Sequence, residues 1–388
     1  MQLGLRLGRH DDSVVDAYFG PPELAAAVQA EPPIPVLALV SQADALLDEV
    51  GDGWLRDQVA GLRTYAGKLA GQPYSYADEV HGCFGVRPTF TDESLFEAAY
   101  DDLAQLLPGT GTLADRYEKW RNSSLVPADR VADVIAAIVA AARVHTTELI
   151  ALPPGETVEV AHVRDVPWNA YNYYLGDLRG RIEVNLDLST SAMDLLRVAL
   201  HEGYPGHQAE RALKEHLLVR GRGLIEETLV LTPTPQSMIA EGIAELAVEV
   251  LLDSPAGPDL AAVIHDAGVT FDLAEALAIE RATQPYRWVE VNAALLLHER
   301  GATEAEAIAY LQQWGPLSAE MATHVVRFIS EPASRIYILT YPAGARLCRG
   351  YVAGQPDRFR RLLTEQVRIR ELADAAGDAD SRGQSRSE

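Results

Sequence analysis

Basic residues and cysteines are scarce in this chain, and each shortage excludes classes of protein. Lysine and arginine number 33 against 56 acidic residues, which gives a formal net charge of −23. Nucleic acids and anionic membranes repel such a surface, so neither is expected as a partner. The chain has two cysteines, Cys83 and Cys348, too few for a disulfide framework. Their apolar neighbours predict buried thiols in an intracellular protein.

Long apolar runs are absent as well. The longest, at 134–142, is far shorter than the roughly 18–20 residues of a membrane helix, so it predicts part of a buried helix. The apolar stretch in residues 1–10 is too short for a secretory signal, so we expect a cytoplasmic protein. The chain shows no internal repeat, no glycine-rich phosphate loop and no Gly-x-Ser-x-Gly elbow. With 388 residues, 48% of them hydrophobic, it is long enough for a large core and one or two domains.

Apolar residues at i, i+3, i+4 spacing predict helices over much of the chain. Five such patterns lie at 37–50, 54–69, 92–107, 112–122 and 128–149. A Pro-Pro-Gly cluster at 153–155 follows the last of them. Helices are expected again from residue 191 to near 373, and the arginine-rich segment 358–370 is expected to form a solvated helix face. These patterns predict a mainly α, multi-helix architecture.

Short strands are expected in the middle of the chain. Residues 157–166 and 181–188 alternate β-branched with polar side chains. The aromatic and amide side chains at 168–174 between them are typical of a pocket lining or of a packed hairpin. We therefore expect a small hairpin or sheet near the functional site. From these patterns we expect the whole chain to divide into three regions. They are an N-terminal helical region (1–155), a metal-binding catalytic region with short strands (156–373) and a disordered tail (374–388).

The segment His-Glu-Gly-Tyr-Pro-Gly-His at 201–207 carries the clearest chemical signal. His201 and His207 are candidate metal ligands, and Glu202 stands where a general base would stand. Two helical positions six apart are separated by about 120° around the axis, against about 40° for four apart. A regular helix would therefore not direct both histidines to one ion. Pro205 removes a backbone donor and flanking glycines loosen the chain, so a bulged or broken turn is expected.

A third ligand is expected from the helical pattern at 237–253. Glu241 and Glu245 share one face of this pattern among apolar neighbours. A carboxylate in apolar surroundings needs a partner, and a metal ion or an arginine would serve. We assign Glu241 to the metal, whereas for Glu245 the two partners remain equal alternatives.

These elements together resemble the DUF885 family. Its His-Glu-x-x-Pro-Gly-His-His hallmark, after a strand ending in Asn, is similar to Val184-Asn185 followed by residues 201–207, and its Glu-Gly-Trp-Ala element to 241–244. His298 and Gly301 match a later histidine element loosely, and Tyr341 and Gly344 match a Tyr-x-x-Gly element. The resemblance covers roughly residues 180–350. It departs at Gln208, which replaces the second histidine of a pair, at Ile243, which replaces Trp, and at 294–296.

The resemblance implies a helical metallopeptidase-like fold, similar to the neurolysin and carboxypeptidase Taq group. With the residue pattern, it predicts a hydrolase of peptide or amide bonds that holds one Zn²⁺ per chain through His201, His207 and Glu241. Glu202 would be the base, and His298 and Tyr341 would stabilise the oxyanion. Each of the last two has a structural alternative, a helix-end role for His298 and packing for Tyr341. The alternative function is a metal-binding protein of the same fold without turnover.

Overall fold

Helices dominate the structure, and small sheets occupy its middle, as the sequence predicts. The computed structural model describes residues 1–166, 168–332 and 334–375. The tail expected at 374–388 lies, from residue 376 on, outside the described residues.

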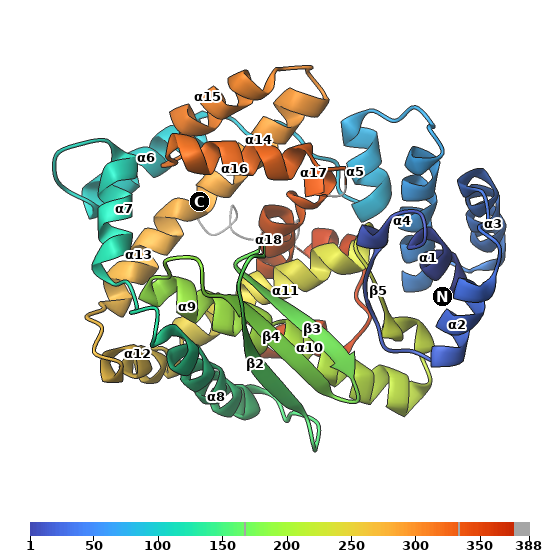
Figure 1. Cartoon of the computed structure of the whole chain (residues 1–388), viewed down its shortest axis with the longest axis horizontal. Coiled ribbons are helices and arrows are strands. Elements are labelled where there is room, and N and C mark those ends of the chain that lie inside the picture. The colour runs from blue at the N-terminus through green and yellow to red at the C-terminus, as the bar shows by residue number, and fades with distance from the viewer. Residues whose placement is uncertain (167, 333, 376–388) are drawn as a thin grey trace, which may run out of the picture.

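The first part of the chain forms eight helices and one edge strand (Figure 1). The elements are α1 (Gln2–Leu7), β1 (Val15–Tyr18), α2 (Pro22–Ala30), α3 (Val36–Glu49), α4 (Trp54–Leu69), α5 (Tyr76–Phe84), α6 (Ser94–Leu106), α7 (Leu113–Ser123) and α8 (Val131–Leu149). The five predicted helices are all present with similar bounds. Helix α7 begins where the Thr112 hydroxyl and the Asp115 carboxylate cap each other's backbone N–H groups. The apolar run at 134–142 lies inside α8, with its core-facing stripe buried as expected.

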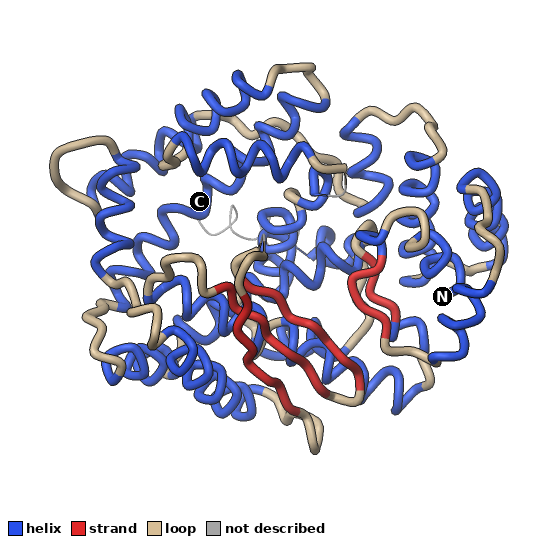
Figure 2. Tube along the Cα trace, viewed as in Figure 1, coloured by secondary structure: helices blue, strands red, loops and turns tan. Residues whose placement is uncertain are grey.

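A three-stranded sheet follows, in the order β2 (Thr157–Val163), β4 (Arg179–Asn185), β3 (Ala170–Gly176) (Figure 2). Strands β3 and β4 form an antiparallel hairpin, and β2 runs parallel to β4. The hairpin turns through Asp177 and Leu178, both at positive φ, as tight two-residue loops require. The aromatic and amide segment at 168–174 is thus largely a strand of a packed hairpin. A second sheet, not predicted, pairs β1 with β5 (Leu229–Leu231).

The rest of the chain is helical. The elements are α9 (Ala192–Val198), the π-helical turns η2 (Ala199–Gly203) and η3 (Glu215–Arg220), α10 (His207–Lys214), α11 (Pro235–Leu252), α12 (Ala256–Asp266), α13 (Leu273–Thr283), α14 (Arg287–His298), α15 (Glu304–Trp314), α16 (Ala319–Ser330), α17 (Ser334–Tyr337), α18 (Thr340–Val352) and α19 (Pro356–Thr364).

Helix α11 lies at the centre of the molecule, between the sheet and α18 (Figure 1). Most of its side chains are buried, because apolar residues occupy nearly all of its circumference. The larger hydrophobic core joins side chains of α3 to α6 with those of α11, α14, α16 and α18. A second core packs α8 and α12 against β4, α9 and η2. Leu200 and Tyr204 belong to the second core and Leu213 of α10 to the larger one, so residues 201–207 lie near the place where the two cores meet.

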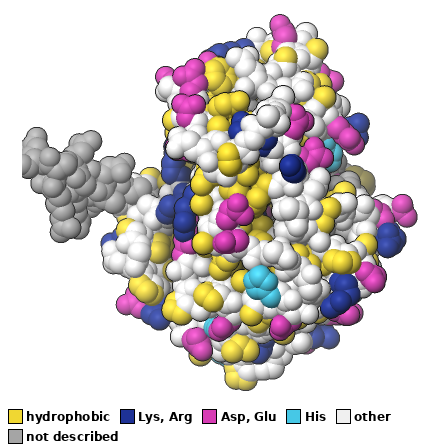
Figure 3. All heavy atoms as spheres, turned by 90° about the vertical axis from the view of Figure 1, so that its left-hand side faces the viewer, with side chains coloured by type: hydrophobic (Ala, Val, Ile, Leu, Met, Phe, Trp, Pro, Cys, Tyr) yellow, Lys and Arg dark blue, Asp and Glu magenta, His cyan; other side chains and the backbone are white. Residues whose placement is uncertain are grey.

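On the face shown in Figure 3, charges of both signs are spread over the surface, and apolar side chains gather in the middle. Among the described residues, no helix combines the length and apolar character needed to cross a bilayer. Cys83 and Cys348 are both buried free thiols, as predicted.

The interpretation of 358–370 as one solvated helix face is wrong. Helix α19 ends at Thr364, and Arg368 beyond it is only 9% exposed. Its guanidinium binds the carboxylates of Asp57 and Asp52. Sequence separation of more than 300 residues hides this pairing from any local pattern.

Candidate metal centre

The two motif histidines are brought together by a break in the helix between them. Helix α9 begins at a capping box formed by Ser191 and Asp194 and passes into the π-turn η2, which carries His201. The Tyr204–Pro205 peptide bond is cis, and α10 begins anew at His207. The predicted departure from regular helix at this motif is confirmed. The two imidazole rings consequently lie 4.8 Å apart, centre to centre, with their planes nearly perpendicular.

Gly206 permits this break. A Cβ atom added there would lie 1.9 Å from the carbonyl oxygen of His201 and 2.4 Å from that of Leu200. Both obstacles are backbone atoms, so no rotamer change could relieve the clash. The Gly206 N–H instead donates to the Leu200 carbonyl at 3.1 Å. The glycine before the second histidine is therefore a steric requirement of the turn.

Tyr204 and Gln208 anchor the turn to the segment before β2. The Tyr204 hydroxyl and the Gln208 amide, the latter at 2.8 Å, both donate to Oε1 of buried Glu156. Arg143 of α8 binds the second oxygen, Oε2, at 3.0 Å. Gln208, which stands where the DUF885 pattern has its second histidine, thus points away from the histidine pair. His207, in contrast, faces His201 and Glu241.

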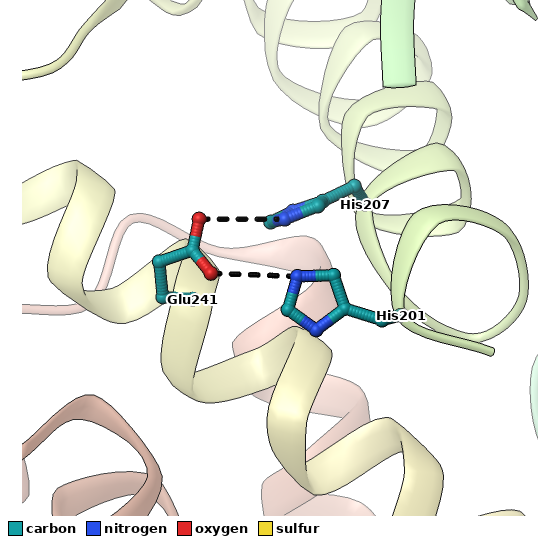
Figure 4. Close-up of side chains that lie close together, drawn as sticks. All are labelled: His201, His207 and Glu241. Carbon is teal, nitrogen blue, oxygen red and sulfur yellow. Dashed lines mark ion pairs between the residues drawn. The ribbon is translucent and has the colours of Figure 1, made fainter. Parts of the chain in front are cut away.

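Glu241 completes the cluster from the middle of α11 (Figure 4). His201 Nε2 lies 3.4 Å from Glu241 Oε2, and His207 Nε2 lies 3.6 Å from Glu241 Oε1. One ligand-type atom from each of the three residues lies within 4.8 Å of the others. The predicted set thus converges from α11 and the two sides of the broken turn.

The electrostatics of the cluster couple the three side chains. Burial by itself lowers the pKa of His201, but the contact with Glu241 and the charges of Glu202, Glu241 and Glu245 raise it to about 9. Burial by itself raises the pKa of Glu241, but its contacts with His201 and His207 bring that pKa well below the ordinary value. A cation between these groups would take over the role of the histidine protons.

Glu245 lies one turn after Glu241 and supports His201 from its other side. Its Oε1 lies 3.6 Å from His201 Nδ1, where a carboxylate can accept the proton of that nitrogen and orient the ring. The same oxygen accepts from Arg287 at 2.8 Å, and Arg197 approaches Oε2 at 3.6 Å. Burial raises the pKa of Glu245, but Arg287, Arg197 and His201 lower it to about 2. Of the two partners that the sequence left open for Glu245, the structure shows the arginines, Arg287 and Arg197.

Glu202 lies beside the cluster. One carboxylate oxygen, Oε1, is 4.0 Å from His201 Nε2, and the side chain is 15% exposed. Its backbone carbonyl accepts a hydrogen bond of 2.8 Å from Asn172 in β3. The sheet thus holds the backbone that carries Glu202, which leaves the carboxylate free to face the centre.

Tyr337 is the residue that the sequence analysis missed. Its hydroxyl donates to Glu241 Oε1 at 2.6 Å from the end of α17. The predicted Tyr341, one turn further along the chain, packs against Tyr337 with ring centres 5.6 Å apart. Burial and the charges of Glu241, Glu202 and Glu245 raise the pKa of Tyr341 well above its ordinary value. Tyr341 therefore lies near the centre, but the hydroxyl that contacts Glu241 belongs to Tyr337.

His298 is not part of this group. Its Nε2 lies 2.6 Å from the carbonyl oxygen of Ile329 in α16, and its ring packs 5.3 Å from that of Tyr76. These contacts join α14 to α16 and α5. They agree with the structural alternative for His298 and give no support to an oxyanion role.

Two glycines of the motif elements place Glu241 beside the tyrosines. Gly242 of α11 and Gly344 of α18 face each other so closely that a Cβ on Gly242 would lie 2.4 Å from the Gly344 carbonyl oxygen. The missing side chains let the two helix backbones touch. The Glu-Gly and Tyr-x-x-Gly elements are therefore two halves of one helix contact.

The donor set fits a divalent metal. Ligand bonds of about 2.0–2.2 Å in a tetrahedral arrangement place neighbouring ligand atoms about 3.4 Å apart. Each histidine lies at a similar distance from one oxygen of Glu241, His201 at 3.4 Å from Oε2 and His207 at 3.6 Å from Oε1. Glu241 Oε2 is buried and makes no hydrogen bond to the described residues, although it needs a partner. Two imidazoles and one carboxylate are the ligand types of catalytic zinc sites.

Comparison with solved structures shows a fold shared with two bacterial proteins. A "putative lipoprotein" from Colwellia psychrerythraea matches with a TM-score of 0.56 and 16% identity, over 89% of this chain and 63% of that chain. A "putative lipoprotein of unknown function" from Shewanella oneidensis matches with a TM-score of 0.53 and 14% identity, over 90% and 75%. The chain thus spans 63% of the length of the Colwellia protein.

A carboxypeptidase from Pyrococcus furiosus, in an "Apo-Mg" form, matches with a TM-score of 0.41 and 12% identity, over 88% of this chain and 72% of that chain. No family model and no curated protein matches the sequence.

Proposed function

We propose that this protein is a zinc-dependent hydrolase of peptide or amide bonds. The observation that carries the proposal is the convergence of His201, His207 and Glu241, with Glu202 beside them. The resemblance of the motif elements to the DUF885 family adds support.

The three ligands would hold one divalent ion. Such an ion, when bound, supplies a Lewis acid that polarises a carbonyl and lowers the pKa of water toward about 7. Glu202 accepts the proton of the attacking water and passes it to the leaving amine. Its carboxylate suits this role because Asn172 fixes the Glu202 backbone and leaves the side chain free.

Other side chains hold this arrangement. Glu245 orients the His201 ring through Nδ1, and Tyr337 fixes one oxygen of Glu241. Tyr341 is the remaining candidate to donate to a developing oxyanion, because it lies at the same centre. His298 is not carried into the proposal, because its ring is engaged by Ile329 and Tyr76.

The test begins with metal content. Protein purified without chelator or nickel resin should contain about one zinc per chain by elemental analysis. His207→Ala should lower the occupancy, whereas Gln208→Ala, at the next position but directed at Glu156, should keep it. Wild-type protein with little metal that does not respond to added zinc would contradict the metal site.

Turnover is tested separately, with a panel of short peptides and amides incubated with and without chelator. The zinc-loaded protein should cleave at least one member, and chelation should abolish cleavage until zinc is restored. Stoichiometric zinc without cleavage of any member would support the alternative, a metal-binding protein without turnover.

A further inference from the structure

A cavity of about 450 Å³ adjoins the metal centre and shares Glu245 with it. One face of this carboxylate contacts His201, and the residue also lines the cavity. Helices α9, α11, α13, α14 and α18 supply most of the walls. The volume is in the range of small-molecule sites.

The cavity lining holds five arginines and four carboxylates, a surplus of one positive charge. Each carboxylate is paired with an arginine of the same lining. The pairs are Glu245 with Arg287 and Arg197, Glu280 with Arg197, Asp253 with Arg281, and Glu249 with Arg349. These pairs account for every acidic group in the lining and for four of the five arginines.

Arg346 is the fifth arginine. Within the described ranges of the chain, no carboxylate pairs with it. Its side chain is exposed, and its guanidinium lies 4.7 Å from the centre of the Trp288 ring, which also lines the cavity. Stacking on an aromatic ring holds a guanidinium in place but leaves its N–H groups free to donate. In a chain of net charge −23, this cavity therefore offers a preorganised cation.

The helix that carries Arg346 also reaches the metal centre. Tyr341 of α18 packs against Tyr337, whose hydroxyl contacts Glu241. The cavity therefore adjoins the centre along α18 as well as at Glu245.

We infer that Arg346 and Trp288 bind a carboxylate of the substrate whose cleavable bond lies at the metal centre. The inference rests on the proposed hydrolase function and adds a substrate class to it, namely short acidic peptides or amides. A guanidinium and a carboxylate form two parallel hydrogen bonds, which also fixes the orientation of the chain. The carboxylate has two possible sources, the free end of a peptide or an acidic side chain.

Binding of three peptides, measured by titration calorimetry, tests the inference and separates the two sources. The peptides are acetyl-trialanine with a free carboxylate, its carboxamide, and the carboxamide of acetyl-Ala-Glu-Ala. The zinc-supplemented Glu202→Gln chain is used throughout, so that no peptide is consumed. At least one carboxylate peptide should bind about tenfold or more tightly than the neutral carboxamide. The one that does identifies the source.

Arg346→Gln should abolish this preference. The matched control is Arg300→Gln, because Arg300 is also exposed, stacks over an aromatic ring (Phe90, at 4.1 Å) and has no carboxylate partner among the described residues, but lies outside the cavity lining. The control should keep the preference.

Equal binding of all three peptides, no measurable binding, or a preference that survives Arg346→Gln would overturn the inference. The readout needs no turnover, so the two proposals fail separately. A carboxylate preference without hydrolysis by the wild-type chain refutes only the hydrolase. Hydrolysis of neutral and acidic peptides with equal efficiency refutes only the carboxylate site.

Discussion

Gly242→Ala tests the contact that links the fold to the metal centre. The added methyl would lie 2.4 Å from the carbonyl oxygen of Gly344, 2.5 Å from its carbonyl carbon and 2.7 Å from the sulfur of Cys348. Ordinary contacts begin at 3.4 Å, so the nearest atom is about 1 Å too close. Backbone atoms of a packed helix have no rotamer to change, so α11 and α18 must separate or tilt.

Overpacking of this kind costs about 1–3 kcal/mol and sometimes more. Alanine recovers about 1 kcal/mol through its higher helix propensity. Since the obstacle here is backbone, we expect the upper part of the range and a net loss of about 2 kcal/mol in the free energy of unfolding. Glu241 is the preceding residue, so a shift of about 1 Å would also move its carboxylate away from the histidines, and zinc affinity should fall by about tenfold or more.

Denaturant unfolding in the presence of chelator measures the first effect, and zinc titration of the refolded protein measures the second. Gly221→Ala is the control, because its nearest neighbour would be the His216 carbonyl oxygen at 3.4 Å and its backbone is already helical. That change should be neutral or slightly stabilising. The reasoning is refuted if Gly242→Ala unfolds at the same denaturant concentration as the wild type and binds zinc equally well.

Three further changes probe single side chains. Glu202→Gln should retain zinc and lower hydrolysis by about 10²-fold or more; loss of zinc would make Glu202 a ligand instead. Tyr337→Phe removes the donor to Glu241, and zinc affinity should fall by about 10- to 100-fold, so an unchanged affinity would exclude a positioning role. Burial raises the pKa of Glu290 from 4.5 to about 7, although Arg287 opposes the shift. Its ionisation then destabilises the folded state increasingly as the pH rises from about 4.5 to above 7, and Glu290→Gln should stabilise the protein by about 1–3 kcal/mol at pH 8 but not at pH 4. An equal effect at both pH values would contradict this assignment.

The sequence by itself determined most of the helices and the identity of the clustered side chains. The apolar spacing that predicts α3, α4 and α8 is a local property, because it sets which face of a helix can be buried. The spacing of His201 and His207 around Pro205 was enough to predict a broken helix, since a regular one would turn the rings apart. Glu241 could be proposed because a carboxylate among apolar neighbours needs a partner.

The tertiary structure alone decided which distant groups meet these side chains. Tyr337 reaches Glu241 across almost 100 residues, and Arg287 reaches Glu245 across 42. Arg368, expected in solvent, is buried against Asp57, more than 300 residues away. Such pairs have no local periodicity, because they depend on how whole helices pack. The packing of α17 and α18 against α11 puts Tyr337 and Tyr341, rather than His298, beside the candidate metal ligands.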